Sequence, residues 1–304
     1  MSAPRIVVVG SLNMDLVVSA SRMPLVGETI EGEAIHYIPG GKGANQAVGC
    51  GRLGADAAMI GAVGDDVFAG QLIAGLEDAG VAAVAVARLD RTATGTATIL
   101  HTPEDNCIVI VPGANGRVTP ETVESHRALI ERADLLLAQL EIPLAAVERA
   151  LSVARSAGVT TVLNPAPARA LPDSLIRLAD WMTPNETEFA ALSGETIAVD
   201  DDAALERAMA RWEAAHGNRL VVTLGSRGAA FLEDGRLRVV PAPKVKPVDT
   251  TGAGDCLNAA FGYGLASGWP PAKALAFGVR AASLSVTRFG AQAGMPTLAE
   301  VNEG

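Results

Sequence analysis

The sequence predicts an α/β fold, with a mostly parallel sheet covered by helices on both faces. Short, mostly apolar runs occur at residues 6–9, 57–62, 135–140, 160–163 and 220–224, and such runs are typical of strands buried on both faces. Helical patterns lie between them, at 44–53, 68–79, 120–132, 144–157 and 203–215. Regular alternation of strands with helices favours a parallel sheet. Gly80 and Gly158 directly follow two of the predicted helices, where C-terminal caps are expected.

Two segments interrupt this alternation and predict a small second sheet. Residues 14–39 and 94–111 are strand-like, with no helix between their strands. In the second segment, Thr96, Thr98, Leu100 and the apolar run 108–111 favour a β-hairpin that turns at 103–106. We interpret both segments as insertions that form a β-lid on a single α/β domain spanning 1–304. The alternative is a hairpin at the edge of the main sheet.

The composition limits the classes of partner. Of the 304 residues, 49% are hydrophobic, and the formal net charge of −10 disfavours binding to nucleic acid or to an anionic membrane. Three cysteines without metal-ligand spacing indicate reduced thiols in a cytoplasmic protein. No apolar run reaches the ~18–20 residues that a membrane-spanning helix needs. We therefore expect a cytoplasmic protein with neither a nucleic-acid nor a membrane partner.

Residues 249–255, with the sequence DTTGAGD, carry the strongest functional signal. Gly252, Ala253 and Gly254 allow a close backbone approach to an anion, and the apolar run that follows predicts a helix whose first N–H groups would face that anion. A carboxylate at this position would repel phosphate. Asp255 is better suited to take a proton from a hydroxyl that attacks the phosphate. The alternative is a capping aspartate after a glycine-rich turn.

A second glycine-rich loop, GGKGANQA at residues 40–47, also precedes a helical run. Lys42 and Asn45 lie at its junction with the helix and are suited to holding sugar hydroxyls. The loop is not a phosphate-binding G-x-x-x-x-G-K-[ST] motif, because neither Ser nor Thr follows Lys42. The alternative is a tight strand-to-helix turn with a solvated lysine.

Together the two loops resemble the paired signatures of the ribokinase-like (PfkB) carbohydrate kinases. Further segments resemble this family in the same order: GSLNMD at 10–15, QLE at 139–141, NPAPAR at 164–169, TPNETE at 183–188 and TLGSRG at 223–228. The resemblance covers nearly the whole chain. It implies a three-layer α/β/α core with a β-lid, dimerisation through the lid, and ATP-dependent phosphorylation of D-ribose to D-ribose 5-phosphate, with Asp255 as base and 252–254 as anion hole.

The resemblance also implies the binding residues. Sugar contacts match Asn13, Asp15, Gly41, Lys42, Gly43, Asn45, Glu141 and Asp255, and nucleotide contacts match Asn185, Thr223, Gly225, Ser226, Gly228 and Gly254. Asn13 and Asp15 follow one predicted strand and Glu141 ends another, and parallel strands bring their carboxyl ends to one edge of a sheet. Taken singly, Asp15 or Glu141 could instead be a solvated loop carboxylate. The turn at 223–228 could be any strand-to-helix turn.

Two ions are implied in the same way. Mg²⁺ would come with ATP and contact Glu188 through water, although Asn185 and Glu188 could instead form an ordinary helix N-terminus. K⁺ as an activator would be held, mostly by backbone carbonyls, at Asp249, Thr251, Ser285, Arg288, Gly290 and Gly294. Gly294 replaces a more usual serine, and Val279 stands where ribokinases often carry histidine or asparagine near adenine.

Other activities remain open at this point. A deoxyribokinase, a fructokinase or a nucleoside kinase would share the fold, and lid residues would select the sugar. A non-catalytic sugar-binding regulator is a further alternative, which an intact Asp255 and anion loop disfavour.

Overall fold

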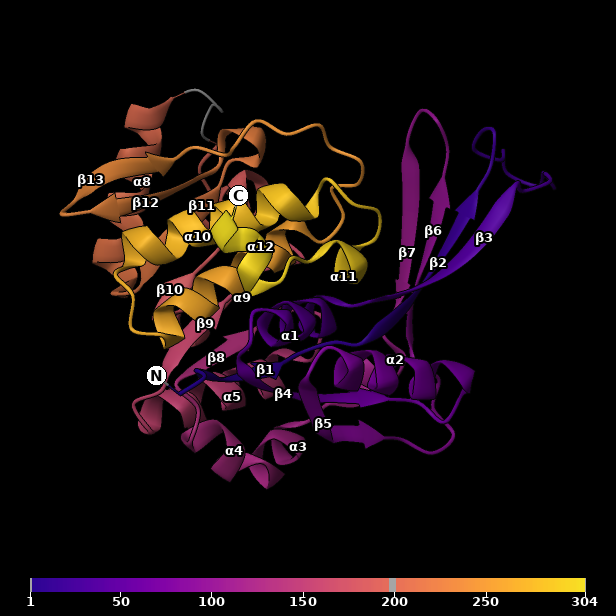
Figure 1. Ribbon diagram of the computed structural model, residues 1–304, viewed down its shortest axis with the longest axis horizontal. Coiled ribbons are helices and arrows are strands. Elements are labelled where there is room, and N and C mark those ends of the chain that lie inside the picture. The colour runs from indigo at the N-terminus through magenta and orange to yellow at the C-terminus, as the bar shows by residue number, and fades with distance from the viewer. Residues whose placement is uncertain (1, 197–200, 304) are drawn as a thin grey trace.

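The computed structural model describes residues 2–196 and 201–303, and its centre is a large twisted sheet (Figure 1). In the described residues this sheet has nine strands in the order β13-β12-β11-β10-β9-β8-β1-β4-β5. Their bounds are β1 Arg5–Val9, β4 Asp56–Val63, β5 Val81–Arg88, β8 Leu135–Ala138, β9 Thr160–Leu163, β10 Trp181–Met182, β11 Arg219–Thr223, β12 Ala229–Glu233 and β13 Arg236–Val240. All neighbouring pairs are parallel except those that β12 makes with β11 and β13.

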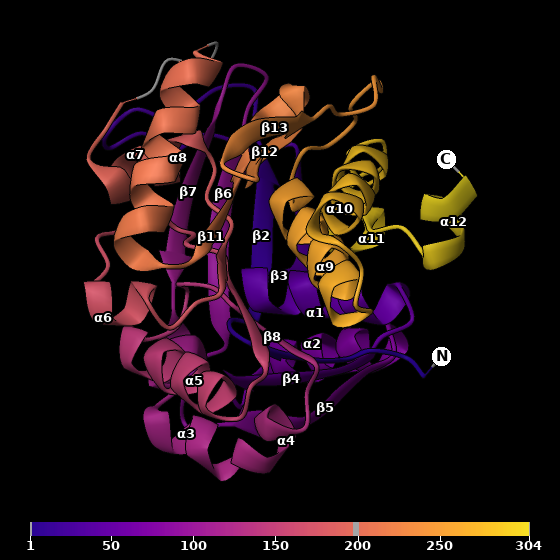
Figure 2. The same cartoon turned by 90° about the vertical axis from the view of Figure 1, so that its left-hand side faces the viewer.

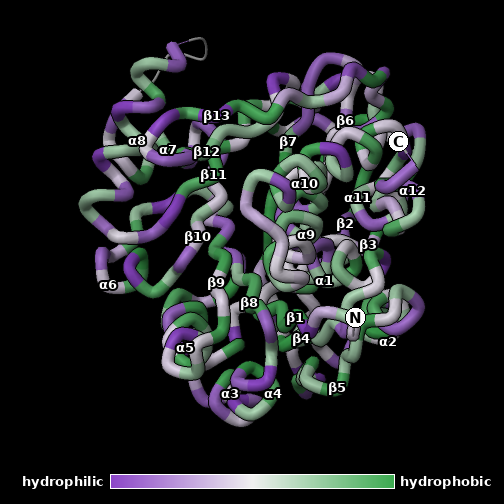
Figure 3. Tube along the Cα trace, turned by 60° about the vertical axis from the view of Figure 1, so that its left-hand side comes forward, coloured by the Kyte–Doolittle hydropathy of each residue, from purple (hydrophilic) through white to green (hydrophobic). Residues whose placement is uncertain are grey.

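The central strand β1 shows why the sequence runs are continuously apolar. Ile6 and Val8 pack into one hydrophobic cluster, whereas Val7 and Val9 pack into another on the opposite face. Successive strand residues point to opposite faces, so a strand covered on both sides needs apolar residues at every position. Figure 3 shows these strands as a mostly hydrophobic centre. The three-layer α/β/α core predicted from the sequence is confirmed.

Helices cover both faces of this sheet (Figure 2). Helices α1, α2, α9 and α10 pack on one face, and α3, α4, α5 and α8 pack on the other. The helix bounds are α1 Lys42–Arg52, α2 Val67–Asp78, α3 Pro120–Ser125, α4 Arg127–Glu131, α5 Leu144–Ser156, α6 Asp173–Ile176, α7 Glu186–Ser193, α8 Asp202–His216, α9 Ala253–Ala266, α10 Pro271–Ser285, α11 Ala291–Gly294 and α12 Leu298–Glu303. No helix in the described ranges is long and apolar enough to cross a membrane.

A second sheet stands apart from the large one, at the right of Figure 1. Its strands are β2 Asn13–Ser19, β3 Ala34–Gly40, β6 Gly95–His101 and β7 Asn106–Val111, in the order β3-β2-β6-β7. The hairpin β6–β7 pairs Leu100 with Cys107 and His101 with Asn106, around the predicted turn. These strands therefore form a separate sheet, and the edge-hairpin alternative is wrong.

The predicted helix at 120–132 is broken in the structure. It divides into α3 and α4 at His126, whose φ of −112° departs from the helical region. Gly80 and Gly158 both have positive φ directly after their helices, which confirms the predicted caps. The strand predicted at 135–140 ends at Ala138, so Gln139 and Glu141 lie beyond the carboxyl end of β8.

Candidate active site

The segment 249–255 leads directly into α9, as its sequence predicts. Gly252 is the residue before the helix and has a φ of 76°, a conformation that glycine adopts without strain. A side chain there would also collide, because a Cβ would lie 2.7 Å from the Ala291 Cβ. The Cys256 N–H donates to the Gly252 carbonyl at 2.8 Å, and the Ala253 N–H donates to the Thr250 carbonyl at 3.3 Å. The N–H groups of the first turn therefore lie at the positive end of the helix dipole.

Asp255 lies in this first turn and is 6% exposed. Its carboxylate does not cap α9, whose start has no side-chain capping bond. It accepts two hydrogen bonds from α1 instead: Asn45 Nδ2 lies 2.9 Å from Oδ2, and Gln46 Nε2 lies 3.1 Å from Oδ1. The capping alternative is therefore wrong, and Asp255 is a buried carboxylate held by two amides.

The start of α1 packs tightly on the loop that follows β1. A Cβ at Gly43 would lie 2.5 Å from the Ser11 nitrogen, so only glycine allows this approach. Glu141 Oε2 accepts hydrogen bonds from the Ser11 hydroxyl at 2.5 Å and from the Lys42 N–H at 3.0 Å. Glu141 thereby connects the end of β8 to the loop at the start of α1, and it is not a solvated loop carboxylate.

Opposite charges meet between these elements. Burial alone would lower the pKa of Lys42, but attraction to Asp255, Glu141 and Glu188 outweighs this effect and raises it. Burial raises the pKa of Asp255, and the Lys42 charge and the two amide donors oppose that shift. These two functional groups, predicted from separate loops, therefore influence one another electrostatically.

Asn13 and Asp15 lie on β2, the strand that leaves the site for the second sheet. The Asn13 Oδ1 accepts a hydrogen bond from Asn115 Nδ2 at 2.8 Å. Asp15 lines a cavity of about 200 Å³ between the second sheet and residues 248–251 and 289–291. Burial raises the pKa of Asp15 to about 7, and repulsion from Glu141 and Asp255 adds to the shift. Asp15 is thus an acidic group within electrostatic range of the other two carboxylates.

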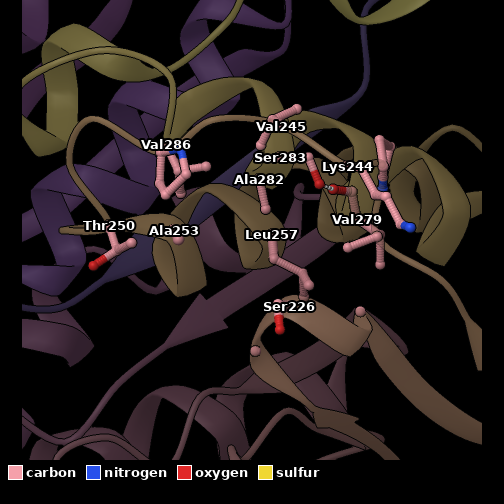
Figure 4. Close-up of a pocket in the computed structure, with 15 residues that line it drawn as sticks. Ser226, Lys244, Val245, Thr250, Ala253, Leu257, Val279, Ala282, Ser283 and Val286 are labelled. Atoms are coloured by element: carbon pink, nitrogen blue, oxygen red, sulfur yellow. Dashed lines mark hydrogen bonds between the residues drawn. The ribbon is translucent and has the colours of Figure 1, made fainter.

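A larger cavity of about 670 Å³ adjoins the start of α9 (Figure 4). Three predicted nucleotide residues line it, Gly225, Ser226 and Gly228, which belong to or follow the short 3-10 helix Gly225–Arg227. The opposite wall is apolar and includes Leu257, Val279, Ala282 and Val286 from α9 and the end of α10. The Ser283 hydroxyl donates to the Val279 carbonyl at 2.9 Å. The cavity is therefore a mostly apolar slot that ends beside Thr250 and Ala253.

Asn185 and Glu188 form a reciprocal cap at the start of α7. Asn185 Oδ1 accepts from the Glu188 N–H at 2.7 Å, and Glu188 Oε2 accepts from the Asn185 N–H at 2.9 Å. Asn185 and Glu188 therefore do form an ordinary helix N-terminus, as the alternative interpretation proposed. This cap does not use the Asn185 Nδ2, which remains available as a hydrogen-bond donor. Asn185 also bridges to Thr223 at the end of β11. Burial raises the pKa of Glu188, with the Asn185 N–H and Lys42 opposing the shift.

The residues matched to a potassium site lie before α9 and between the end of α10 and the end of α11. Asp249 accepts hydrogen bonds from the Thr251 N–H and the Gly290 N–H, both at 2.9 Å. These bonds hold the pKa of Asp249 below its usual value although burial opposes the shift. A Cβ at Gly294 would lie 2.8 Å from the Ser285 carbonyl oxygen and 3.7 Å from that of Arg288. The Arg288 guanidinium pairs with Glu300, so Arg288 would contribute only its carbonyl.

The sequence reasoning missed several buried amides of this site. Gln46, Gln139 and Asn164 are 0%, 0% and 7% exposed, and they are connected by hydrogen bonds to one another. The available signal was polarity: each interrupts or directly follows an apolar run. The loop 241–248, part of which lines the large cavity, was also missed because it belongs to no regular element. In the described part of the chain, no group of three or more His, Cys, Asp and Glu side chains could hold a metal ion by itself.

The raised pKa of Asp15 predicts a pH-dependent stability. Because the pKa is about 7 in the folded protein and 3.8 as a model value, the folded state retains a proton that the unfolded state loses between these values. The contribution is fully present below the unfolded pKa and is lost as pH rises through the folded pKa. Asp15→Asn should therefore raise the free energy of unfolding above pH ~7, by on the order of 1–3 kcal/mol relative to its effect in acid. Urea denaturation at several pH values measures this.

The control for that measurement is Asp90→Asn, which removes the same charge from an exposed loop. Its stability should follow the wild-type pH dependence. Parallel curves for Asp15→Asn and the wild type would contradict the raised pKa.

The chain is 42% identical to a ribokinase of Bacillus subtilis (strain 168) over 298 residues, and this alignment covers 98% of each chain. It is 36% identical over 301 residues to a deoxyribokinase of Salmonella typhi, covering 98% of this chain and 97% of the relative. The solved structure of Arabidopsis thaliana ribokinase complexed with ribose and ATP matches with a TM-score of 0.92 and 32% identity, over 99% of this chain and 98% of that one. The profile of the family described as "pfkB family carbohydrate kinase" matches residues 3–298. The chain belongs to the pfkB family of carbohydrate kinases.

Proposed function

We propose that the protein transfers the γ-phosphoryl group of ATP to the hydroxymethyl oxygen of D-ribose, which gives D-ribose 5-phosphate and ADP. The observation that carries this proposal is the position of Asp255, a buried carboxylate in the first turn of α9, close to the large cavity and stabilised by the charge of Lys42. Ribokinases from several organisms match the chain over nearly its full length at 37–42% identity, and one structural relative was solved with ribose and ATP.

In this reaction Asp255 accepts the proton of the attacking hydroxyl. The hydroxyl oxygen forms a bond to the γ-phosphorus as the bond to the β–γ bridging oxygen breaks, and that oxygen leaves with ADP. Backbone N–H groups of Gly252, Ala253 and Gly254 stabilise the charge that develops on the phosphoryl oxygens. Sugar contacts come from Asn13, Asp15, Gly41, Lys42, Gly43, Asn45 and Glu141, whose carboxylates and amides suit hydroxyl groups.

The nucleotide occupies the large cavity in this proposal. Its phosphates extend toward the start of α9, with contacts from Asn185, Thr223, Gly225, Ser226, Gly228 and Gly254. Glu188 would hold, through water, the Mg²⁺ that accompanies ATP, and the ion would supply positive charge against the phosphates. Glu188 suits this water-mediated role because it is a buried carboxylate fixed by the Asn185 N–H. Val279 presents an apolar surface to the adenine ring, so shape rather than hydrogen bonding would select adenine.

Deoxyribose is the second candidate acceptor, because a deoxyribokinase is 36% identical over the full chain. The two sugars differ by one hydroxyl, and a site that hydrogen-bonds a hydroxyl rejects the analogue that lacks it. ADP release with ribose, deoxyribose, fructose and adenosine distinguishes these acceptors. A non-catalytic sugar-binding protein would release no ADP with any of them.

Asp255 is the base in this mechanism, so its carboxylate should be needed for turnover. Asp255→Asn keeps the shape of the side chain but removes the base, so folding and ribose binding should persist while kcat falls about 10²–10⁴-fold. Steady-state ADP release measures turnover, and calorimetric titration with ribose measures binding. Turnover within a few-fold of the wild type would exclude Asp255 as the base.

We propose further that K⁺ activates the enzyme from the loops at 249–251 and 285–294. The support is the convergence of the Ser285 and Arg288 carbonyls on the space that a Cβ at Gly294 would fill, together with Asp249, which joins the two loops through Thr251 and Gly290. A cation there would hold the anion loop in place without touching phosphate, and preorganised donors need no rearrangement during the reaction.

The initial rate should therefore rise several-fold when KCl replaces NaCl at constant ionic strength, with Mg²⁺ saturating. Because the cation acts on the anion loop, the increase should appear in kcat more than in the KM of ribose. A rate that does not change with K⁺ concentration would refute the cation site and leave the kinase function intact.

We also propose that the second sheet is the lid over the sugar and that the protein is a homodimer through it. Strand β7 is an edge strand whose residues are all exposed, and Ile108, Val109, Ile110 and Val111 are 46–59% exposed. An exposed apolar edge strand invites pairing with another chain. A second copy of this chain would bury it.

The double substitution Ile108→Lys with Val109→Lys places charge on both faces of β7 and should convert a dimer into a monomer in light scattering. Val84→Lys is the control, because Val84 is 88% exposed on β5, in the other sheet. A wild-type monomer, or an unchanged dimer in the double variant, would contradict this interface.

A further inference from the structure

Gln46 is a buried side chain that the mechanism above does not use. It lies in α1 and is 0% exposed. Its Nε2 donates to Asp255 Oδ1 at 3.1 Å and to Asn164 Oδ1 at 3.3 Å, and its Oε1 accepts from Gln139 Nε2 at 2.6 Å. Both amide hydrogens and the carbonyl oxygen therefore have partners.

The orientation of these amides follows from the carboxylate. An ionised carboxylate only accepts hydrogen bonds, so Gln46 must turn its nitrogen toward Asp255 and its oxygen toward Gln139. Gln139 must then present its own nitrogen, which leaves its Oε1 facing Gly10. That oxygen is one of two buried side-chain polar atoms without a partner among the described residues. A Cβ at Gly10 would lie 2.1 Å from it, so the glycine makes room for this arrangement.

The same network reaches the anion loop. Asn164 Nδ2 donates to the Thr183 carbonyl at 3.1 Å, and the Thr183 hydroxyl donates to Asn258 Oδ1 at 2.6 Å. Asn258 Nδ2 in turn donates to the Gly254 carbonyl at 2.9 Å. Gln139, Asn164 and Thr183 directly follow β8, β9 and β10. The network therefore connects three adjacent strand ends to both the carboxylate and the first turn of α9.

We propose that Gln46 is a positioning residue for phosphoryl transfer, which fixes the rotation of the Asp255 carboxylate relative to the N–H groups at the start of α9. This inference rests on the proposed function. Asn45 holds the other carboxylate oxygen, so the two amides together prevent rotation about the Cβ–Cγ bond. Gln46 is itself fixed by Gln139 and Asn164, whereas Asn45 accepts from Gln292 Nε2 in the short helix α11, at 3.1 Å.

A residue with this role affects turnover and not binding. Gln46 is fully buried, so neither sugar nor nucleotide can touch it. A base must be aligned with the proton that it accepts, and a displacement of about 1 Å can lower the rate about 10²-fold. The predicted signature is a fall in kcat with unchanged KM values, and it should depend on the presence of the Asp255 carboxylate.

The experiment is a double-mutant cycle between Gln46→Met and Asp255→Asn, assayed by ribose-dependent ADP release. Methionine has similar length but no donor. In the wild-type background, Gln46→Met should lower kcat about 10–100-fold while the KM of ribose and of ATP stay within about threefold. In the Asp255→Asn background the same substitution should lower kcat less than about threefold, because the group through which it acts is gone.

Asn218→Leu is the matched control. Asn218 is a 3% exposed amide that accepts from Trp212 Nε1 and donates to the Ile176 carbonyl, both at 3.0 Å, in the hydrophobic layer of α8. The variant should lose stability and keep the wild-type kcat per folded molecule. Circular dichroism and urea denaturation report folding for each variant.

Equal losses of kcat in both backgrounds would overturn the inference, as would raised KM values with unchanged kcat. Absence of ribose-dependent ADP release by the wild type would overturn the proposed function as well, so the two failures are distinguishable. If Gln46→Met does not fold, Gln139→Met decides, because it removes the hydrogen bond that orients the Gln46 Oε1 and also removes the unpaired oxygen. A kcat loss that disappears in the Asp255→Asn background supports the inference, and wild-type kcat refutes it.

Discussion

The burial of one carboxylate governs the arrangement of this site. Asp255 is 6% exposed, and a charge that leaves water must be compensated by donors or by an opposite charge. Helix α1 supplies both, through two amides and Lys42. It can do so only because it packs closely on two sides: a Cβ at Gly49 would lie 2.6 Å from the Ala259 Cβ of α9, and a Cβ at Gly43 would lie 2.5 Å from the Ser11 nitrogen. The glycines of α1 therefore allow the close packing that brings the compensating amides and Lys42 to the carboxylate.

The large sheet could be predicted where burial is two-sided, because the buried residues of strands such as β1 and β8 are then apolar on both faces. Other elements lack that signal. Edge strand β5 alternates exposed and buried positions and is rich in alanine, and β10 has only two residues. The antiparallel pair β12–β13 did have a signal, because Asp234 and Gly235 form its turn with φ values of 50° and 75°. That dipeptide is a known hairpin turn, and the sequence reasoning overlooked it. The break between α3 and α4 has no equivalent signal in the residues around His126.

The site divides in the same way between local and tertiary determinants. Both glycine-rich loops could be identified because a backbone approach needs glycine at fixed local positions, as the φ values of Gly41 and Gly252 show. Placing Asn13 and Glu141 at one edge required only the rule for parallel strands. The hydrogen-bond partners within the site come from elements more than 90 residues apart in the sequence, as in the contacts of Gln46 with Gln139 and Asp255. No local pattern specifies such contacts. A buried polar residue within an apolar run indicates only that it has a hydrogen-bond partner, and not which residue that partner is.

The electrostatics of the site explain how a chain with a net charge of −10 can accept a polyanionic substrate. Burial raises the pKa of Asp15, and repulsion from Glu141 and Asp255 adds to the shift, so Lys42 alone does not neutralise three carboxylates. The proposed substrates would contribute what the site lacks: sugar hydroxyls donate to the acidic residues, and Mg²⁺ accompanies the phosphates. The positive potential for the phosphates is local, since it comes from the start of α9 and from Lys42. The apolar cavity beyond it adds contact area without charge. The sugar hydroxyls would therefore compensate the buried carboxylates by hydrogen bonding, whereas the phosphate charge would be compensated by Mg²⁺, Lys42 and the start of α9, so that each substrate would meet a different part of the electrostatics of the site.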